Sequence, residues 1–222
     1  DFCLSRGLGD VYKRQGQYRY IMQQEMEYAP HNRLSVLTTL TSAMDATALF
    51  CMKEKVKKYA EEVKCVKIDY APFVMKAVVA ALKKHPDLNS CIDRDRLFVQ
   101  NIYDIEIFGS VIKDADKKDM FTIAYELEHR PVYSQPTFAI LPYGVKGETY
   151  PIIIPTSSEV CVLGVSMIYN DFSLSGSGLV NSKIIYASLV FDSSYVSREE
   201  ASGFMADLNM FMENPEISLL DI

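Results

Sequence analysis

The stretch from residue 70 to 84 constrains the fold most, because its apolar side chains cover much more than one stripe of a helix. They recur at intervals of three and four residues, with others between them: Phe73, Val74, Ala77, Val78, Ala81 and Leu82. Pro72 suits a first helical turn, and Pro86 blocks continuation beyond a basic end that includes His85. The pattern predicts a buried helix, gives His85 a structural role, and requires other elements to cover the helix.

Further segments have helical or strand patterns. Helices are predicted at residues 46–60, 120–128 and 198–212, with Asp45 as the N-cap of the first and Pro215 ending the last. Strands are predicted at residues 33–42, 97–111 (one or two strands), 137–141, 150–154, 160–168 and 183–191, and residues 175–178 are interpreted as a flexible hairpin connection. This order predicts one α/β (α+β) domain in which a β-sheet is packed against helices.

Composition narrows the classes of protein. Lys and Arg number 23 against 29 Asp and Glu, a net charge of −6, and the basic residues do not cluster, which argues against a nucleic-acid partner. No apolar run is long enough for a membrane span, so we expect no membrane partner and a cytoplasmic location. Residues 1–15 have no periodicity and look like a translated sequencing adapter, so they are predicted to be non-native or disordered, and residues 16–222 to form the domain.

The five cysteines have no metal-site spacing. Without a C-x-x-C pair or a nearby histidine, no metal site is expected, and the thiols are predicted to be reduced and mostly buried. Cys51 follows two apolar residues in a helical stripe and is assigned to the core.

Four stretches, in order, carry a resemblance. They are YAPFVMKAVVAALKKHPDLN (residues 70–89), VIKDADKK (111–118), EVCVLGV (159–165) and MENPEI (212–217). Together they resemble the catalytic domain of the 2-oxoacid dehydrogenase acyltransferases, the dihydrolipoamide acyltransferase components, whose relatives include the chloramphenicol acetyltransferases. The resemblance covers nearly all of the chain from Gly16.

The resemblance implies a fold and a chemistry. It implies a two-layer sandwich of a mixed β-sheet with packed helices, assembled as a homotrimer with active sites between subunits. In such a site an acyl group passes between coenzyme A and a dihydrolipoyl thiol. A histidine acts as the base, because a thiol near pKa 8.5 is mostly protonated at neutral pH.

The motif that supplies this base in the family is altered here. The family has H-x-x-x-D-G directly after an S-x-x-F-D strand, and this chain has SLVFD (residues 188–192) followed by SSYVSR (193–198). Ser193 thus stands at the histidine position and Ser197 at the aspartate position. A hydroxyl has no basic site near neutral pH, and general base catalysis contributes roughly 10² to 10⁴ in rate.

A second family position has also changed. TFAILPYG (residues 137–144) resembles a T-F-T-I-S-N-x-G strand, but Leu141 occupies the place of the serine that would steady an oxyanion. The segments at residues 103–111 and 127–137 are shorter than in the family, which implies a narrower substrate channel.

Two other histidines are candidates for a substitute base. His31 and His129 are both predicted in polar, loop-like surroundings, where a solvated histidine is the common case. The leading hypothesis is therefore a catalytically degenerate family member that acts as a binding or structural subunit, as a homotrimer or beside an active paralogue. The alternative is an active acyl-coenzyme A dependent transferase that takes its base from elsewhere.

Overall fold

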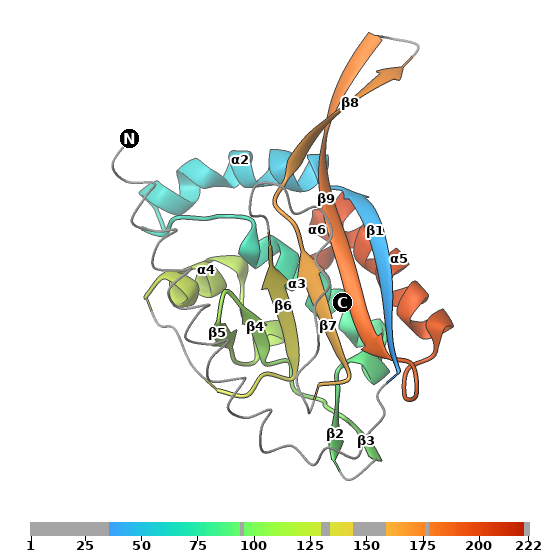
Figure 1. Cartoon of the computed structure of the whole chain (residues 1–222). Coiled ribbons are helices and arrows are strands. Elements are labelled where there is room, and N and C mark those ends of the chain that lie inside the picture. Colours follow the sequence, from blue (N-terminus) through green and yellow to red (C-terminus); the bar gives the residue numbers. More distant parts are fainter. Residues whose placement is uncertain (1–35, 94–95, 130–133, 144–158, 176–177, 220–222) are drawn as a thin grey trace.

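One mixed sheet forms the centre of the molecule (Figure 1). The computed structural model describes residues 36–93, 96–129, 134–143, 159–175 and 178–219. In spatial order the sheet comprises β1 (Leu37–Asp45), β9 (Gly178–Asp192), β7 (Cys161–Val165), β6 (Phe138–Pro142), β4 (Ile105–Ile107) and β5 (Ser110–Ile112), and β8 (Tyr169–Ser175) pairs with β9 beyond this path. The β4–β6 and β6–β7 pairs are parallel and the others antiparallel. A separate hairpin joins β2 (Ser90–Asp93) to β3 (Arg96–Val99).

Helices form the second layer, behind the sheet in Figure 1. They are α2 (Thr47–Glu62), α3 (Ala71–Lys84), α4 (Met120–His129), α5 (Arg198–Glu213) and the short α6 (Pro215–Ser218), with 3₁₀ turns η1 (Pro86–Leu88) and η2 (Ala115–Lys117). The predicted fold class, a mixed sheet with packed helices, is confirmed.

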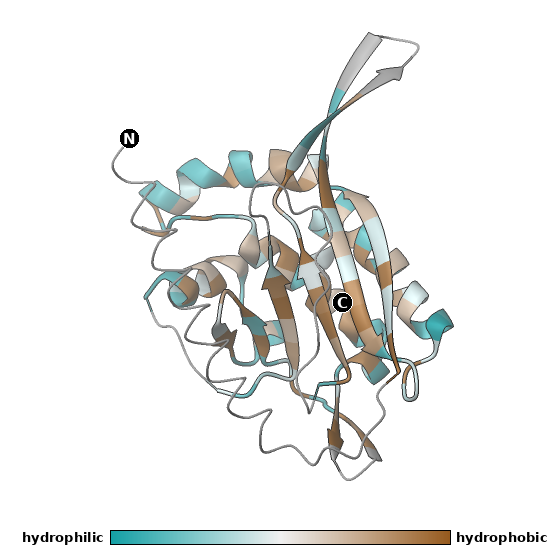
Figure 2. Ribbon diagram, viewed as in Figure 1, coloured by the Kyte–Doolittle hydropathy of each residue, from teal (hydrophilic) through white to brown (hydrophobic). Residues whose placement is uncertain are grey.

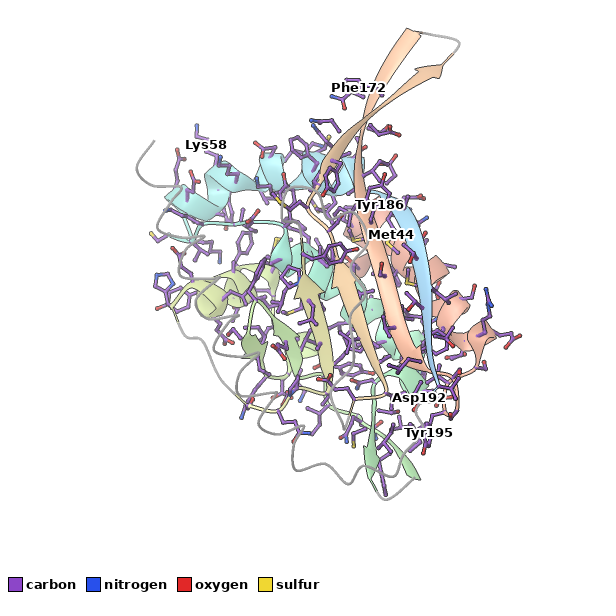
Figure 3. All side chains as sticks on the ribbon, in the orientation of Figure 1. Met44, Lys58, Phe172, Tyr186, Asp192 and Tyr195 are labelled. Atoms are coloured by element: carbon purple, nitrogen blue, oxygen red, sulfur yellow. The ribbon has the colours of Figure 1, made fainter. Side chains whose placement is uncertain are left out.

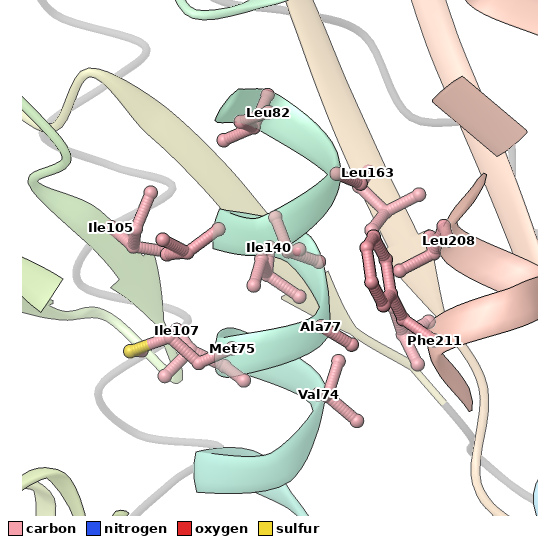
Figure 4. Packing of buried hydrophobic residues seen from close by; sticks show 14 of the residues in the cluster. Val74, Met75, Ala77, Leu82, Ile105, Ile107, Ile140, Leu163, Leu208 and Phe211 are labelled. Carbon is pink, nitrogen blue, oxygen red and sulfur yellow. The ribbon is translucent and has the colours of Figure 1, made fainter. Parts of the chain in front are cut away.

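Helix α3 is buried as its pattern predicts. It packs against the sheet and beside α5 in the helical layer, with Ile105, Ile107 and Ile140 of the strands on one side and Leu208 and Phe211 of α5 on the other (Figure 4). Each aliphatic side chain of this size stabilises the fold by about 1.5–3 kcal/mol when it is fully buried. In Figure 2 hydrophobic colour follows the central strands and α3, whereas much of α2 is hydrophilic.

Strands β8 and β9 form a long hairpin that projects beyond the body of the molecule (Figure 1). Strand β9 begins earlier than the predicted residue 183, and β8 was not predicted at all. The reason is physical: Asn170, Asp171 and Phe172 are all exposed, so the part of β8 whose burial is described does not alternate between buried and exposed side chains as a half-buried strand does. The connection itself, residues 176–177, lies outside the described residues, as does the predicted strand at 150–154.

Three local predictions need correction. Asp45 ends β1 instead of capping α2, although its Oδ1 accepts a hydrogen bond from the Thr47 N–H at 2.8 Å. The segment at residues 97–111 contains parts of three strands, β3, β4 and β5. Cys51 is exposed, because α2 buries only a narrow part of its surface.

The thiols are less buried than predicted. Of the four cysteines that the structure describes, Cys51 and Cys65 are exposed, Cys91 is half-buried and Cys161 is buried. Cys3 and the proposed boundary between residues 15 and 16 fall outside the described part of the chain.

Candidate functional site

The turn between β9 and α5 carries the two altered motif positions. Asp192, at the end of β9, is 3% exposed, and its Oδ1 accepts a hydrogen bond from the Ser194 N–H at 2.9 Å. Its backbone carbonyl accepts from the N–H groups of Tyr195 and Val196, both at 3.1 Å. Figure 3 shows Asp192 and Tyr195 together at this end of the sheet. The turn is therefore fixed by its own backbone and one buried carboxyl group.

Ser193 is fully engaged with the neighbouring strand. Its N–H and its hydroxyl both donate to the carbonyl oxygen of Val36, at 2.9 and 2.8 Å. Val36 directly precedes β1, which pairs with β9 along its whole length. The side chain at the family's histidine position thus extends the β1–β9 pairing by one residue.

Ser197 has a different structural task. It is the N-cap of α5, and its hydroxyl accepts a hydrogen bond from the Glu200 N–H at 3.1 Å. Such a cap satisfies one of the unpaired N–H groups at a helix start. Glu199 and Glu200 in the first turn also suit the positive end of the helix dipole.

Leu141 lies far from this turn within one chain. The sheet register aligns Leu141 with Gly164, and Gly164 with Ser188. Ser193 is five residues further along the chain than Ser188, which corresponds to roughly 16 Å at about 3.3 Å per residue. A single subunit therefore does not bring the two altered family positions together.

A small group of hydroxyls surrounds the level of Leu141, and the sequence reasoning did not find it. The Tyr143 hydroxyl lies 3.5 Å from Ser188 Oγ, which is 3.5 Å from Thr41 Oγ1. Ser188 is 1% exposed, so this polar side chain is buried at the level of Leu141, two strands away from it. The available signal was alternation: Tyr143, two residues after Leu141, shares its face of β6 and the following segment.

Neither substitute base is placed at the turn. His31 lies outside the described residues. His129 ends α4, where it is exposed, stacks on Tyr125 with ring centroids 4.5 Å apart, and has Nδ1 3.1 Å from the Tyr125 carbonyl oxygen. Helix α4 packs against β5, the strand at the opposite edge of the sheet from β1. His129 and Ser193 therefore lie near opposite edges of the sheet.

His85 has the structural setting expected from the sequence. It follows α3, and its ring lies between two carboxylates of α5, Glu200 (Nδ1 to Oε1, 3.0 Å) and Asp207 (Nε2 to Oδ2, 2.9 Å). Desolvation raises the pKa of Asp207, but hydrogen bonds from His85 and Lys84 outweigh it and hold that pKa below the usual aspartate value.

The described part of the chain has neither a metal-binding cluster nor a membrane-spanning helix. Within it, no group of three or more His, Cys, Asp or Glu side chains is arranged to hold a metal ion. The helices described there are too short or too polar for any of them to cross a membrane.

Comparison with known proteins identifies the family. The profile of the 2-oxoacid dehydrogenases acyltransferase (catalytic domain) matches residues 14–220. The chain belongs to this family. The dihydrolipoyllysine-residue succinyltransferase component of the 2-oxoglutarate dehydrogenase complex of Staphylococcus epidermidis is 27% identical over 210 residues, which are 86% of this chain and 50% of that protein. The chain thus spans about half the length of this curated relative.

Solved structures agree on the fold of this acyltransferase-family chain. The dihydrolipoamide acetyltransferase of Azotobacter vinelandii, studied for the role of a serine, a histidine and an asparagine in its catalytic mechanism, superposes with a TM-score of 0.77 at 22% identity, covering 92% of this chain and 90% of that one. A chloramphenicol acetyltransferase superposes with a TM-score of 0.50 at 13% identity, covering 80% and 89%. The predicted resemblance to both groups is confirmed.

Proposed function

We propose that this chain is a catalytically degenerate member of the acyltransferase family that acts as a binding or structural subunit. The observation that carries the proposal is the use of both motif hydroxyls for structure. Ser193 bonds the backbone of Val36, and Ser197 caps α5. Neither side chain offers a basic nitrogen, and within the described residues no histidine lies in the turn to replace one.

The residues at these positions do not fit the activation of a coenzyme A thiol. A thiolate is the reactive form, so a transferase of this kind needs a base beside the sulfur. Ser193 cannot take up a proton near neutral pH, and Leu141 cannot donate a hydrogen bond to an oxyanion. Both tasks that the family resemblance implies therefore lack a suitable side chain at the matching positions, Ser193 and Leu141.

We also propose assembly into a homotrimer, or into a mixed oligomer with an active paralogue. The distance of roughly 16 Å between the levels of Leu141 and Ser193 supports this, because a site that uses both positions needs two subunits. The Staphylococcus relative is a component of a multienzyme complex, which also supports assembly. Size in solution tests it, and a strictly monomeric protein would contradict the proposal.

The deciding experiment is an acyl-transfer assay on four proteins. These are the unaltered chain, Ser193→His, Ser197→Asp and the double variant, each assayed with acetyl-coenzyme A or succinyl-coenzyme A and dihydrolipoamide. We expect no turnover from the unaltered chain and some from the double variant. Aspartate caps a helix as well as serine does, so Ser197→Asp preserves α5 and is a matched control for folding.

The competing function, an active transferase with a base from elsewhere, predicts turnover in the unaltered chain. That turnover should disappear in His31→Gln or His129→Gln. Calorimetric titration of coenzyme A adds a separate reading, since micromolar binding, about −8 kcal/mol, would show a binding role for the subunit. Absence of binding by folded protein would leave a purely structural role.

A further inference from the structure

We propose that Lys183 is the pivot of the projecting β8–β9 hairpin: its side chain fixes the direction of this arm relative to α2, and loss of its charge releases the arm. The arm consists of residues 169–175 of β8 and residues 178–183 of β9 (Figure 1). The inference does not rest on the proposed function, because it concerns how one part of the fold is held and not which ligand the chain binds.

The arm leaves the main sheet at Lys183. Strand β1 pairs with β9 only as far as Ile184, and β7 pairs with β9 only as far as Ala187. From Lys183 outward, the only described strand that pairs with β9 is β8. A two-stranded hairpin by itself is marginally stable in water, so the order of the arm depends on how its base is anchored.

The backbone of Lys183 is anchored to the start of α2. Its carbonyl oxygen accepts a hydrogen bond from the Ala46 N–H at 2.7 Å, and its own N–H donates to Thr47 Oγ1 at 2.9 Å. Ala46 is the N-cap of α2 and Thr47 is the first residue of the helix. The N–H groups at a helix start have no intrahelical partner, so the Lys183 carbonyl satisfies one of them. The arm therefore joins α2 through a single residue of β9.

The side chain of Lys183 makes two further contacts, one with α2 and one across the arm. Its Nζ lies 4.8 Å from the centre of the Phe50 ring, within the range of a cation–π contact. The same ammonium donates to Oδ1 of Asn170, the residue of β8 that pairs with Lys183. The backbone contacts fix where the arm begins, and the ammonium connects both of its strands to the helix. We infer that these side-chain contacts set the direction of the arm.

The Phe50 ring is itself held in place. It stacks on the Tyr70 ring, with centroids 6.2 Å apart and an angle of 21° between the planes. Tyr70 is the N-cap of α3, and Lys53 Nζ lies 4.5 Å from the centre of its ring. A row of alternating charged and aromatic side chains thus runs from the arm across α2 to the start of α3. Because two helices anchor this row, Phe50 offers Lys183 a ring whose position is fixed.

The direction of the arm decides where an exposed aromatic ring is presented. Phe172 of β8 is 59% exposed and lies two residues beyond Asn170 towards the connection. While Lys183 contacts Phe50, the arm holds the Phe172 ring in one direction from the body of the molecule. An uncharged side chain in place of Lys183 loses both side-chain contacts, and the arm then moves about its backbone anchor.

Hydrogen exchange of peptides from residues 169–182 tests the pivot, with a peptide from α3 as the internal measure of global stability. We expect Lys183→Met to lower protection of the arm by about three- to tenfold, the loss expected for one cation–π contact and one charged hydrogen bond at a partly exposed site. Protection of α3 should not change. Lys183→Arg keeps the charge and can still lie over the ring, so it should retain most of the protection. Phe50→Leu removes the ring and keeps the charge, and should also lower protection of the arm.

Lys58→Met is the matched control. It removes the same charge from an exposed position of α2 that pairs with Glu62, and Figure 3 shows Lys58 towards the other end of this helix from the arm. Its arm peptides should exchange as in the unaltered protein. Equal protection of the arm in Lys183→Met and in the unaltered protein would overturn the proposal. An equal loss in the arm and in α3 would overturn it as well, because Lys183 would then be a general stabilising residue.

Discussion

The hydroxyl of Ser193 donates to the carbonyl oxygen of Val36 at 2.8 Å, and so joins two residues that are 157 positions apart in the sequence. We expect Ser193→Ala to lower the free energy of unfolding by about 1 kcal/mol, because one hydrogen bond is lost while the Ser193 N–H still donates to Val36. In a chain of this length that corresponds to a fall in Tm of about 2–4 °C. Ser194→Ala, at the neighbouring position, which is exposed as Ser193 is, is the control and should change Tm less. A loss of acyl transfer in Ser193→Ala without a loss of stability would instead give the hydroxyl a functional role.

Because the His85 ring lies against Gly203, we expect Gly203→Ala to destabilise the protein. Glycine to alanine inside a helix normally stabilises by roughly 1 kcal/mol. At Gly203 the new Cβ meets a ring held by two carboxylates, so we expect a net loss of about 1–2 kcal/mol in urea unfolding. In a His85→Ala background the same substitution should become stabilising. If Gly203→Ala stabilises the protein in both backgrounds, the ring can move aside and the close packing inferred here is wrong.

The β4–β5 connection offers a stabilising change. Phe108 (φ 54°) and Gly109 (φ 74°) both have positive φ, as the two central residues of a type I′ hairpin turn do. A phenylalanine is strained at this positive φ, whereas asparagine is favoured there. Phe108→Asn should therefore stabilise the protein by about 1 kcal/mol. Gly109→Ala is the paired test: a Cβ would have open space, so any loss of stability reports backbone strain alone. Thermal unfolding of the two variants should shift in opposite directions.

Thiol labelling tests the cysteine environments. Cys51 and Cys65 are exposed and should react with a disulfide reagent in the native protein. Burial raises the pKa of Cys161, and its Sγ lies 3.1 Å from the Leu88 carbonyl oxygen, so it should react only when the protein unfolds. Mass spectrometry of the labelled peptides assigns each site. Rapid native labelling at Cys161 would contradict the packing between β7 and η1.

Acid stability reports on Asp207. Its pKa is lowered in the folded state, so its contribution to stability is present above the ordinary aspartate value of 3.8 and is lost as pH falls through the lower folded-state pKa. Asp207→Asn should therefore flatten the decline of stability below about pH 4. Denaturant unfolding between pH 2.5 and 6 measures this, with the exposed Asp171→Asn as the control. Identical acid profiles for the unaltered protein and Asp207→Asn would refute the pairing with His85 and Lys84.

The sequence predicted those parts of the fold that depend on local pattern. Helix α3 was predicted at residues 70–84 and runs from Ala71 to Lys84, because its apolar spacing and two prolines are signals contained in the segment itself. Cys51 was misplaced because helical spacing identifies an apolar face without showing how much of it another element covers. Strand β8, which the sequence pattern does not predict, shows the same limit. It is a strand because it pairs with β9, and not because its own side chains alternate.

The candidate site was predictable only as a set of positions. The replacements at Ser193, Ser197 and Leu141 were visible in the motifs, but what these side chains do was not. The Ser193 contact depends on the register between β1 and β9. The cluster of hydroxyls formed by Tyr143, Ser188 and Thr41 depends on the register between several strands. Long-range pairing of this kind has no signal in a single segment.

The separation of Leu141 from Ser193 has a consequence for any mixed assembly. If each site is built from one residue set on one subunit and a second set on its neighbour, this chain contributes an altered half to two sites at once. A single copy inserted among active paralogues would then silence both sites that it borders, so its effect on the assembly would exceed its share of the subunits. The acyl-transfer activity of such a mixed complex would then fall with the fraction of this chain in it, while the assembly itself stays intact.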